Sequence, residues 1–248
     1  MKLNKILQLM QQNATQQRPP LSLVRSEDKT EATLYIYDVI DPWWGVSAAT
    51  IAPVIASLDP TTTLHVRVNS PGGDVFEGRA IRTHIQQFKG KTIAHIDGLA
   101  ASAATTVADA CDEVEISEGG MYMIHNGWTF AMGNRHDMRK TADLLDKVDA
   151  SIVADYAKRT GLDIEQLTKW MDEETWFSAE ESVTHGFANR LATLPDKTKN
   201  SDAGRKWNLA AYDKTPQALL VQTPASNDTD FEAWRAHNER RLKVLQIA

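Results

Sequence analysis

Short β-rich runs alternate with helical patterns between about residues 33 and 124, and this alternation constrains the fold more than any other feature. Within each helical pattern the apolar residues recur at intervals of three and four. Strands that alternate with helices usually form a parallel sheet covered by those helices. We therefore expect an α/β core of repeated strand-helix units with a largely parallel sheet. The expected strands are 33–40, 64–68, 92–96, 113–116 and 121–124, and the expected helices are 47–58, 73–88 and 101–110.

A long helical pattern follows this core at 135–158 and is polar on most of its surface, so we expect a helix that projects from the body. Shorter helices are expected at 162–170 and 179–185, and a last strand at 189–194. The chain then divides into three parts. Residues 1–29 form an N-terminal helix and linker, residues 30–194 form the main domain, and residues 195–248 form a partly disordered appendage with a terminal helix at 227–245.

Composition and charge exclude several classes of protein. The net charge is -6 and no cluster of Lys and Arg is present, which argues against nucleic-acid binding. No run approaches the roughly 20 apolar residues that a membrane span needs, and the N-terminus lacks the pattern of a signal peptide. The single cysteine, Cys111, fits a reducing compartment and a place in the core. We therefore expect a cytoplasmic protein.

Three short segments carry residues of chemical interest, each directly after an expected strand. The first contains Gly72 and Gly73, whose backbone can approach a ligand closely and present N–H groups. The second places Ser102 among small residues at the start of a helix, where a nucleophile is accessible. The third places His125 at the end of an apolar strand, unlike His65 and His95, which lie inside strands.

Each segment also has a structural interpretation. The glycine pair is typical of a tight turn, Ser102 could cap a helix, and a lone histidine is usually structural. The combination favours a catalytic site, because the carboxyl ends of parallel strands meet at one edge of the sheet. No ligand spacing typical of a metal site and no P-loop pattern occurs, so neither a metal nor a cofactor is expected.

Together the segments SPGG at 70–73, GLAAS at 98–102 and MIH at 123–125 resemble the Clp protease proteolytic subunit family. Residues 137–161 resemble the family's long handle helix, and residues 174–191 resemble its closing helix and strand. Residues 37–48 are similar to the Clp-like peptidases of tailed phages and prophages. The resemblance covers roughly residues 34–191 and implies a ClpP/crotonase-like fold.

The resemblance implies a serine endopeptidase in which Ser102 forms the acyl-enzyme and His125 is the general base. Backbone N–H groups of Gly72, Gly73 and Ala103 would hold the oxyanion. The third residue departs from the family, because the position of its aspartate holds a glutamate here. We predict Glu174 in this role, with Asp172 as the alternative; both could instead be surface acids.

The resemblance also implies partners. These are protein or peptide substrates bound as an added strand, further copies of the chain in a homo-oligomeric ring, and a separate AAA+ unfoldase. The phage branch suggests cleavage of scaffold or capsid protein during head maturation, with proheads as an alternative location to the cytoplasm. Alternatives are a bacterial Clp subunit, a crotonase-type acyl-thioester enzyme, a Ser/Lys signal-peptide peptidase, and a silent ring or head-assembly protein. Ser102 and His125 in register argue against the last three.

Overall fold

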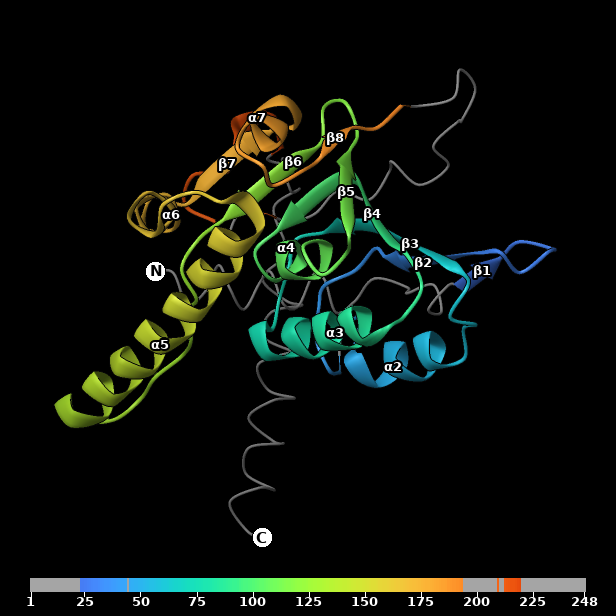
Figure 1. Cartoon of the computed structure of the whole chain (residues 1–248). Helices are drawn as coiled ribbons and strands as arrows, with labels where there is room; N and C mark the ends of the chain where they lie inside the picture. The colour runs from blue at the N-terminus through green and yellow to red at the C-terminus, as the bar shows by residue number, and fades with distance from the viewer. Residues whose placement is uncertain (1–22, 44, 194–208, 210–211, 220–248) are drawn as a thin grey trace, which may run out of the picture.

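One eight-stranded sheet organises the computed structural model, which describes residues 23–43, 45–193, 209 and 212–219 (Figure 1). Along the sheet the order is β1 (Leu23–Arg25), β2 (Glu31–Ile36), β3 (Thr63–Ser70), β4 (Thr92–Ala101), β5 (Glu113–Ile116) and β8 (Arg190–Leu191). β6 (Met121–Ile124) pairs with the carboxyl end of β4 and with β7 (Thr175–Ser178). Only β1 and β7 pair antiparallel with their described neighbours, so the expected, largely parallel sheet is confirmed.

Helices α2 (Ala48–Ala56), α3 (Val75–Gln87) and α4 (Ala103–Ala108) lie together on one side of this sheet (Figure 1). The Ser47 side chain caps α2 by accepting from the Thr50 N–H, and the Asp74 carboxylate caps α3 by accepting from the Glu77 N–H. Alternate residues of β3 are buried, as expected for a strand with one face on a core. Residues buried between the sheet and these helices include Leu34, Leu64, Val66, Val68, Ile51, Ile55, Ile81 and Ile85.

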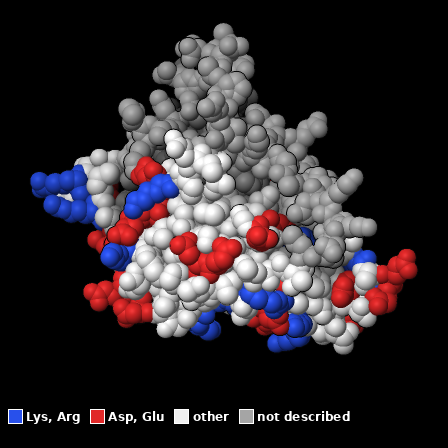
Figure 2. All heavy atoms as spheres, turned by 90° about the horizontal axis from the view of Figure 1, so that it is seen from above, with Lys and Arg blue, Asp and Glu red and all other residues white. Residues whose placement is uncertain are grey.

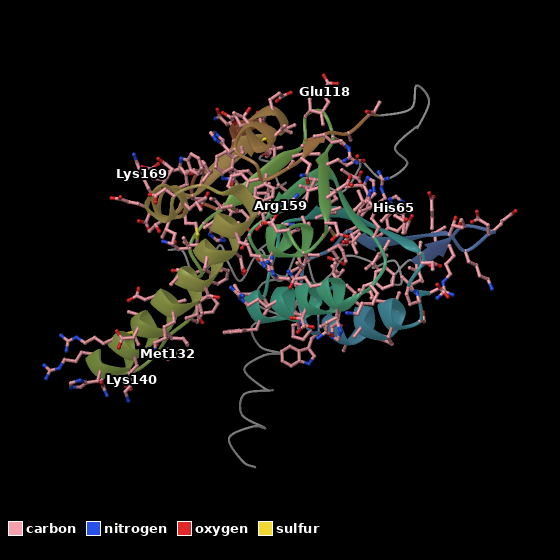
Figure 3. The ribbon with its side chains drawn as sticks, viewed as in Figure 1. His65, Glu118, Met132, Lys140, Arg159 and Lys169 are labelled. Carbon is pink, nitrogen blue, oxygen red and sulfur yellow. The ribbon has the colours of Figure 1, made fainter. Side chains whose placement is uncertain are left out.

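Helix α5 (Arg135–Thr160) projects from the body, as its polar pattern predicted. A capping box of Asn134 and Asp137 begins it, and Gly161, in the left-handed conformation, ends it. Met132 and Lys140 lie at its distal end, whereas Arg159 lies close to α4 (Figure 3). No described helix is long and apolar enough to cross a membrane. On the face shown in Figure 2, basic and acidic side chains are interspersed.

Several boundaries differ from the sequence-based expectation. The strand expected at 33–40 ends at Ile36, and Ile40 forms only isolated bridges. β4 continues to Ala101, so Ser102 directly follows a strand, and α4 spans only 103–108. Strands β1 and β7 were not predicted, and the last strand is limited to Arg190–Leu191. The expected N-terminal helix and the helix at 227–245 lie outside the described residues.

After α5 the chain forms α6 (Ile164–Asp172), β7, α7 (Ala179–Thr184) and β8. Farther along, residues 212–219 end in a single 3-10 turn, η1 (Gln217–Leu219). The described part of this segment, orange-red in Figure 1, lies near β7, and Trp176 of that strand contacts Tyr212. Two regions distant in sequence therefore meet beside the carboxyl ends of the central strands.

Candidate active site

The carboxyl ends of three neighbouring strands carry the segments that the sequence analysis selected. β3 leads into the loop with Gly72 and Gly73, β4 ends before Ser102, and β6 ends before His125. β4 pairs in parallel with both β3 and β6, so all three ends lie at the same edge of the sheet. This is the edge at which open α/β sheets collect their functional residues.

Ser102 and His125 are joined by a hydrogen bond of 2.8 Å between Ser102 Oγ and His125 Nε2. Ser102 occupies the N-cap position of α4, but its side chain makes no capping hydrogen bond. Its backbone has φ 54° and ψ -126°, an uncommon conformation for a residue with a side chain, and its N–H donates to the Met123 carbonyl at 2.9 Å. The strained turn therefore directs the hydroxyl to the imidazole and not to the helix.

The surroundings of His125 keep its imidazole neutral. Burial lowers the pKa of His125 to about 4, while the negative charge of Glu174 acts in the opposite direction. At neutral pH the ring therefore has one nitrogen free to accept a proton. A neutral imidazole at hydrogen-bond distance from a hydroxyl is the arrangement that activates a serine nucleophile.

Gly72 lies against Ser102 so closely that no side chain fits at this position. A Cβ there would lie 2.4 Å from the Ala101 carbonyl oxygen and 2.8 Å from Ser102 Cβ, and the residue has φ +88°. The Gly72 N–H donates to Ser70 Oγ at 3.1 Å. No described residue accepts a hydrogen bond from the N–H of Gly73 or Ala103. Of the three N–H groups predicted to hold the oxyanion, those of Gly73 and Ala103 are therefore available to a ligand. The role of Gly72 is to let its loop pack closely against Ser102.

The two acidic candidates have different surroundings. Asp172, exposed at the end of α6, accepts a 2.7 Å hydrogen bond from Asn126 Nδ2. Glu174 lies in the following turn at φ 49° and contributes electrostatically to His125. Among the described residues, neither carboxylate forms a hydrogen bond with His125. The Glu174 carboxylate accepts instead from the backbone N–H groups of Asp213 at 2.8 Å and Lys214 at 2.6 Å.

Tyr212 also belongs to this site, and the sequence analysis did not select it. Its ring meets the His125 ring edge-on, with centroids 5.2 Å apart, and its hydroxyl donates to the Pro71 carbonyl. Burial raises the pKa of the Tyr212 phenol and the charge of Glu174 adds to this, while a hydrogen bond with Ser102 acts in the opposite direction. In the sequence, Tyr212 ends a short apolar run with no periodic pattern, so it gave no signal of a place in the site.

Other titratable residues fill structural roles. His65 Nδ1 and His95 Nε2 are 2.8 Å apart, and His95 Nδ1 contacts Glu115 Oε1 at 2.5 Å, so these strand histidines pair along the sheet. Cys111 is buried, which raises the pKa of its thiol to about 12. Within the described ranges, no group of three or more His, Cys, Asp or Glu side chains is arranged to hold a metal ion.

Comparison with known proteins identifies a family for this arrangement. The family profile described as Clp protease matches residues 30–194. The ATP-dependent Clp protease proteolytic subunit of Leuconostoc citreum is 29% identical over 139 residues, which cover 54% of this chain and 70% of that protein. The proteolytic subunit 2 of Treponema denticola is 30% identical over 152 residues, which cover 58% and 75% of the two chains.

A solved structure shares the fold. A ClpP1 mutant from Listeria monocytogenes matches with a TM-score of 0.59 and 24% sequence identity, over 66% of this chain and 92% of that chain. At this level of identity the match shows the common fold and not the activity.

Proposed function

The chain belongs to the Clp protease family, a family of serine-type peptidases, and from this premise we propose that it is a serine endopeptidase with Ser102 as nucleophile and His125 as general base. The observation that carries the proposal is the 2.8 Å hydrogen bond from a strained serine, which caps no helix, to a neutral histidine. In this role Ser102 Oγ attacks the peptide carbonyl while His125 Nε2 takes the hydroxyl proton. The proton then passes to the leaving amine, and water hydrolyses the acyl-enzyme.

The oxyanion of the tetrahedral intermediate would accept hydrogen bonds from the N–H groups of Gly73 and Ala103. Both groups lack an acceptor among the described residues, and both belong to segments that border Ser102. Glu174 would complete the triad as the acid that stabilises the imidazolium. Its influence on the pKa of His125 favours it over Asp172, whose carboxylate binds Asn126.

A serine-directed probe tests this function. A fluorophosphonate should add once to the wild-type chain, as read by intact mass, and should not add to Ser102→Ala. Ser57→Ala is the matched control, because Ser57 lies at the end of α2 and hydrogen-bonds Arg25, outside the site. Equal labelling of Ser102→Ala and wild type would contradict the assignment of the nucleophile.

The biological setting is a finer part of the proposal. The similarity of residues 37–48 to the phage branch supports cleavage of scaffold or capsid protein in an assembling head. The names of the relatives, ATP-dependent Clp protease proteolytic subunit, support instead a subunit of an ATP-dependent protease. By the family resemblance, this subunit would form a cytoplasmic ring that works with an unfoldase. Co-expression with neighbouring structural genes separates the two, because capsid or scaffold protein that stays unprocessed would contradict the head-maturation role.

A further inference from the structure

The described residues of the C-terminal segment are Leu209 and residues 212–219, and Tyr212 of this segment contacts His125. Tyr212 covers the His125 ring, and its hydroxyl engages the Pro71 carbonyl in the glycine loop. The Tyr212 ring also contacts the ring of Trp176 in β7, and the two ring centroids are 5.8 Å apart. Tyr212 therefore lies between the glycine loop and β7, the strand that follows Glu174.

Two anchors fix this segment. The Glu174 carboxylate accepts from two consecutive backbone N–H groups, those of Asp213 and Lys214. Leu209 is only 4% exposed and packs in an apolar cluster with Leu99, Ala101 and Met123. Ala101 directly precedes Ser102, and Met123 lies two residues before His125, so the cluster lies beside the site.

A local turn connects the two anchors. The Tyr212 N–H donates to the Leu209 carbonyl at 3.1 Å, and Thr215 Oγ1 donates to the same carbonyl at 2.9 Å. This turn presents Tyr212 to the site while Leu209 stays in the apolar cluster. The contacts of the segment are therefore made by a side chain, by backbone amides and by an apolar residue, which are the kinds of contact that a bound peptide makes.

We propose that the C-terminal segment occupies the substrate cleft as an intramolecular inhibitor and keeps the peptidase latent until it is displaced. The inference rests on the proposed function, since it assigns an occupant to that active site. A substrate must bring its carbonyl to Ser102 beside the glycine loop, where Tyr212 now lies. The segment also holds Glu174 through both carboxylate oxygens, so it binds the acid proposed to assist His125.

Tethering strengthens such an inhibitor. A segment attached to the same chain competes at an effective concentration far above that of a free peptide. Substrate then binds only to the fraction of molecules in which the segment is displaced, and the apparent rate falls by that fraction. Weakening the segment should therefore raise the rate at which Ser102 reacts, without any change in the catalytic residues.

The test measures the labelling rate of Ser102 with a peptidyl diphenylphosphonate, whose peptide part must lie in the cleft. Tyr212→Ala should react about tenfold faster than wild type if the open fraction is about a tenth. Gln217→Ala, an exposed position in the same segment, is the matched control and should react at the wild-type rate. The synthetic peptide LAAYDKTPQAL, added in trans, should slow the labelling of Tyr212→Ala again.

A second measurement needs no substitution. Attaching the same peptidyl phosphonate to wild-type Ser102 should increase hydrogen exchange at the amides of Asp213 and Lys214, because the segment must leave the cleft. Equal labelling rates in the three proteins, together with unchanged exchange, would overturn the inference and leave the proposed function standing. Absence of an adduct in every protein would contradict the proposed function and the inference with it.

Discussion

His125 has two neighbours, Ser102 and Glu174, and the fold holds them in different ways. Ser102 follows β4 within a central parallel sheet, and its surroundings are buried residues of the main core. Glu174 lies in the turn between α6 and β7, and its carboxylate binds backbone groups 39 and 40 positions farther along the chain. The proposed nucleophile is therefore built into the sheet, whereas the proposed acid is bound by the C-terminal segment, which we infer to be displaceable.

Both neighbours have strained backbones, at φ 54° for Ser102 and φ 49° for Glu174. Such conformations cost of order 1–3 kcal/mol each in residues other than glycine, so the surrounding structure must compensate for them. At Ser102 the compensation comes from the close contact with Gly72 and the hydrogen bond to the Met123 carbonyl. At Glu174 the backbone N–H donates to the Met171 carbonyl at 3.1 Å, and the C-terminal segment binds the carboxylate. The site therefore has two halves: a scaffold half, with Gly72 and Ser102, and an acid half, with Glu174. The difference indicates that the acid half can be regulated while the scaffold half stays intact.

Substitution of Gly72 should produce the largest effect on the scaffold half. In Gly72→Ala the new Cβ would meet the Ala101 carbonyl and Ser102 Cβ, so the strand end that carries the nucleophile must shift. We expect peptidase activity to fall by about 10²–10³, as for the loss of an oxyanion-hole donor. Turnover of a fluorogenic peptide and the labelling rate of Ser102 both measure this fall.

Gly119→Ala is the matched control for that substitution. Gly119 has a similar positive φ, +78°, but nothing lies within 4 Å of the Cβ position. This variant should lose about 1 kcal/mol of unfolding free energy through backbone strain and keep its activity. If Gly119→Ala lost as much activity as Gly72→Ala, strain alone would explain both results and the close contact at Ser102 would have no special role.

The acid half is tested next by Glu174→Gln and Asp172→Asn, both in a Tyr212→Ala background. That background separates the effect on His125 from the release of the segment, because Glu174 takes part in both. Removing the Glu174 charge should lower kcat/KM about tenfold, since the imidazolium loses a nearby negative charge.

Asp172→Asn should change kcat/KM less than about twofold, because Asp172 binds Asn126 at an exposed position. A larger loss in Asp172→Asn than in Glu174→Gln would transfer the role of the acid to Asp172. Thermal unfolding of both variants checks that the comparison concerns catalysis and not folding.

The same contrast explains what the sequence could predict. The strand-helix alternation and the residues at three strand ends depend on local patterns, and these predicted the sheet and the meeting of Gly72, Ser102 and His125. Strand β1 has only three residues, too few for a periodic pattern to identify it. Strand β7 is fixed by its antiparallel pairing with β6, which no local pattern indicates. The observed boundaries of strands and helices differ from the predicted ones where tertiary contacts determine them. An example is β4, which was expected to end at residue 96 and extends to Ala101.

The place of Tyr212 could not be predicted, for a different reason. Its contacts join residue 212 to residues 71, 125 and 176, and nothing in the intervening polar stretch indicates such a return of the chain. The same long-range contacts determine the surroundings of Glu174. The sequence motif could therefore select this residue as a candidate acid, but it could not reveal that backbone amides already bind its carboxylate.

The last expected effect concerns pH and is smaller than the loss in Glu174→Gln. In wild type, burial holds the pKa of His125 at about 4, so the imidazole stays neutral down to mildly acidic pH, and Tyr212 contacts the ring edge-on. In Tyr212→Ala water reaches the ring, and its pKa should rise toward about 6.5. At about pH 6 the labelling rate of this variant should then fall about fourfold below its own plateau, because only the neutral imidazole accepts the Ser102 proton.

Wild type and Gln217→Ala should keep their plateau at the same pH, since protonation of the ring in the closed form is disfavoured. The same fall of the labelling rate at acidic pH in all three proteins would mean that the sheet edge, and not Tyr212, excludes water from His125. The two halves of the site would then be less separate than the contacts indicate.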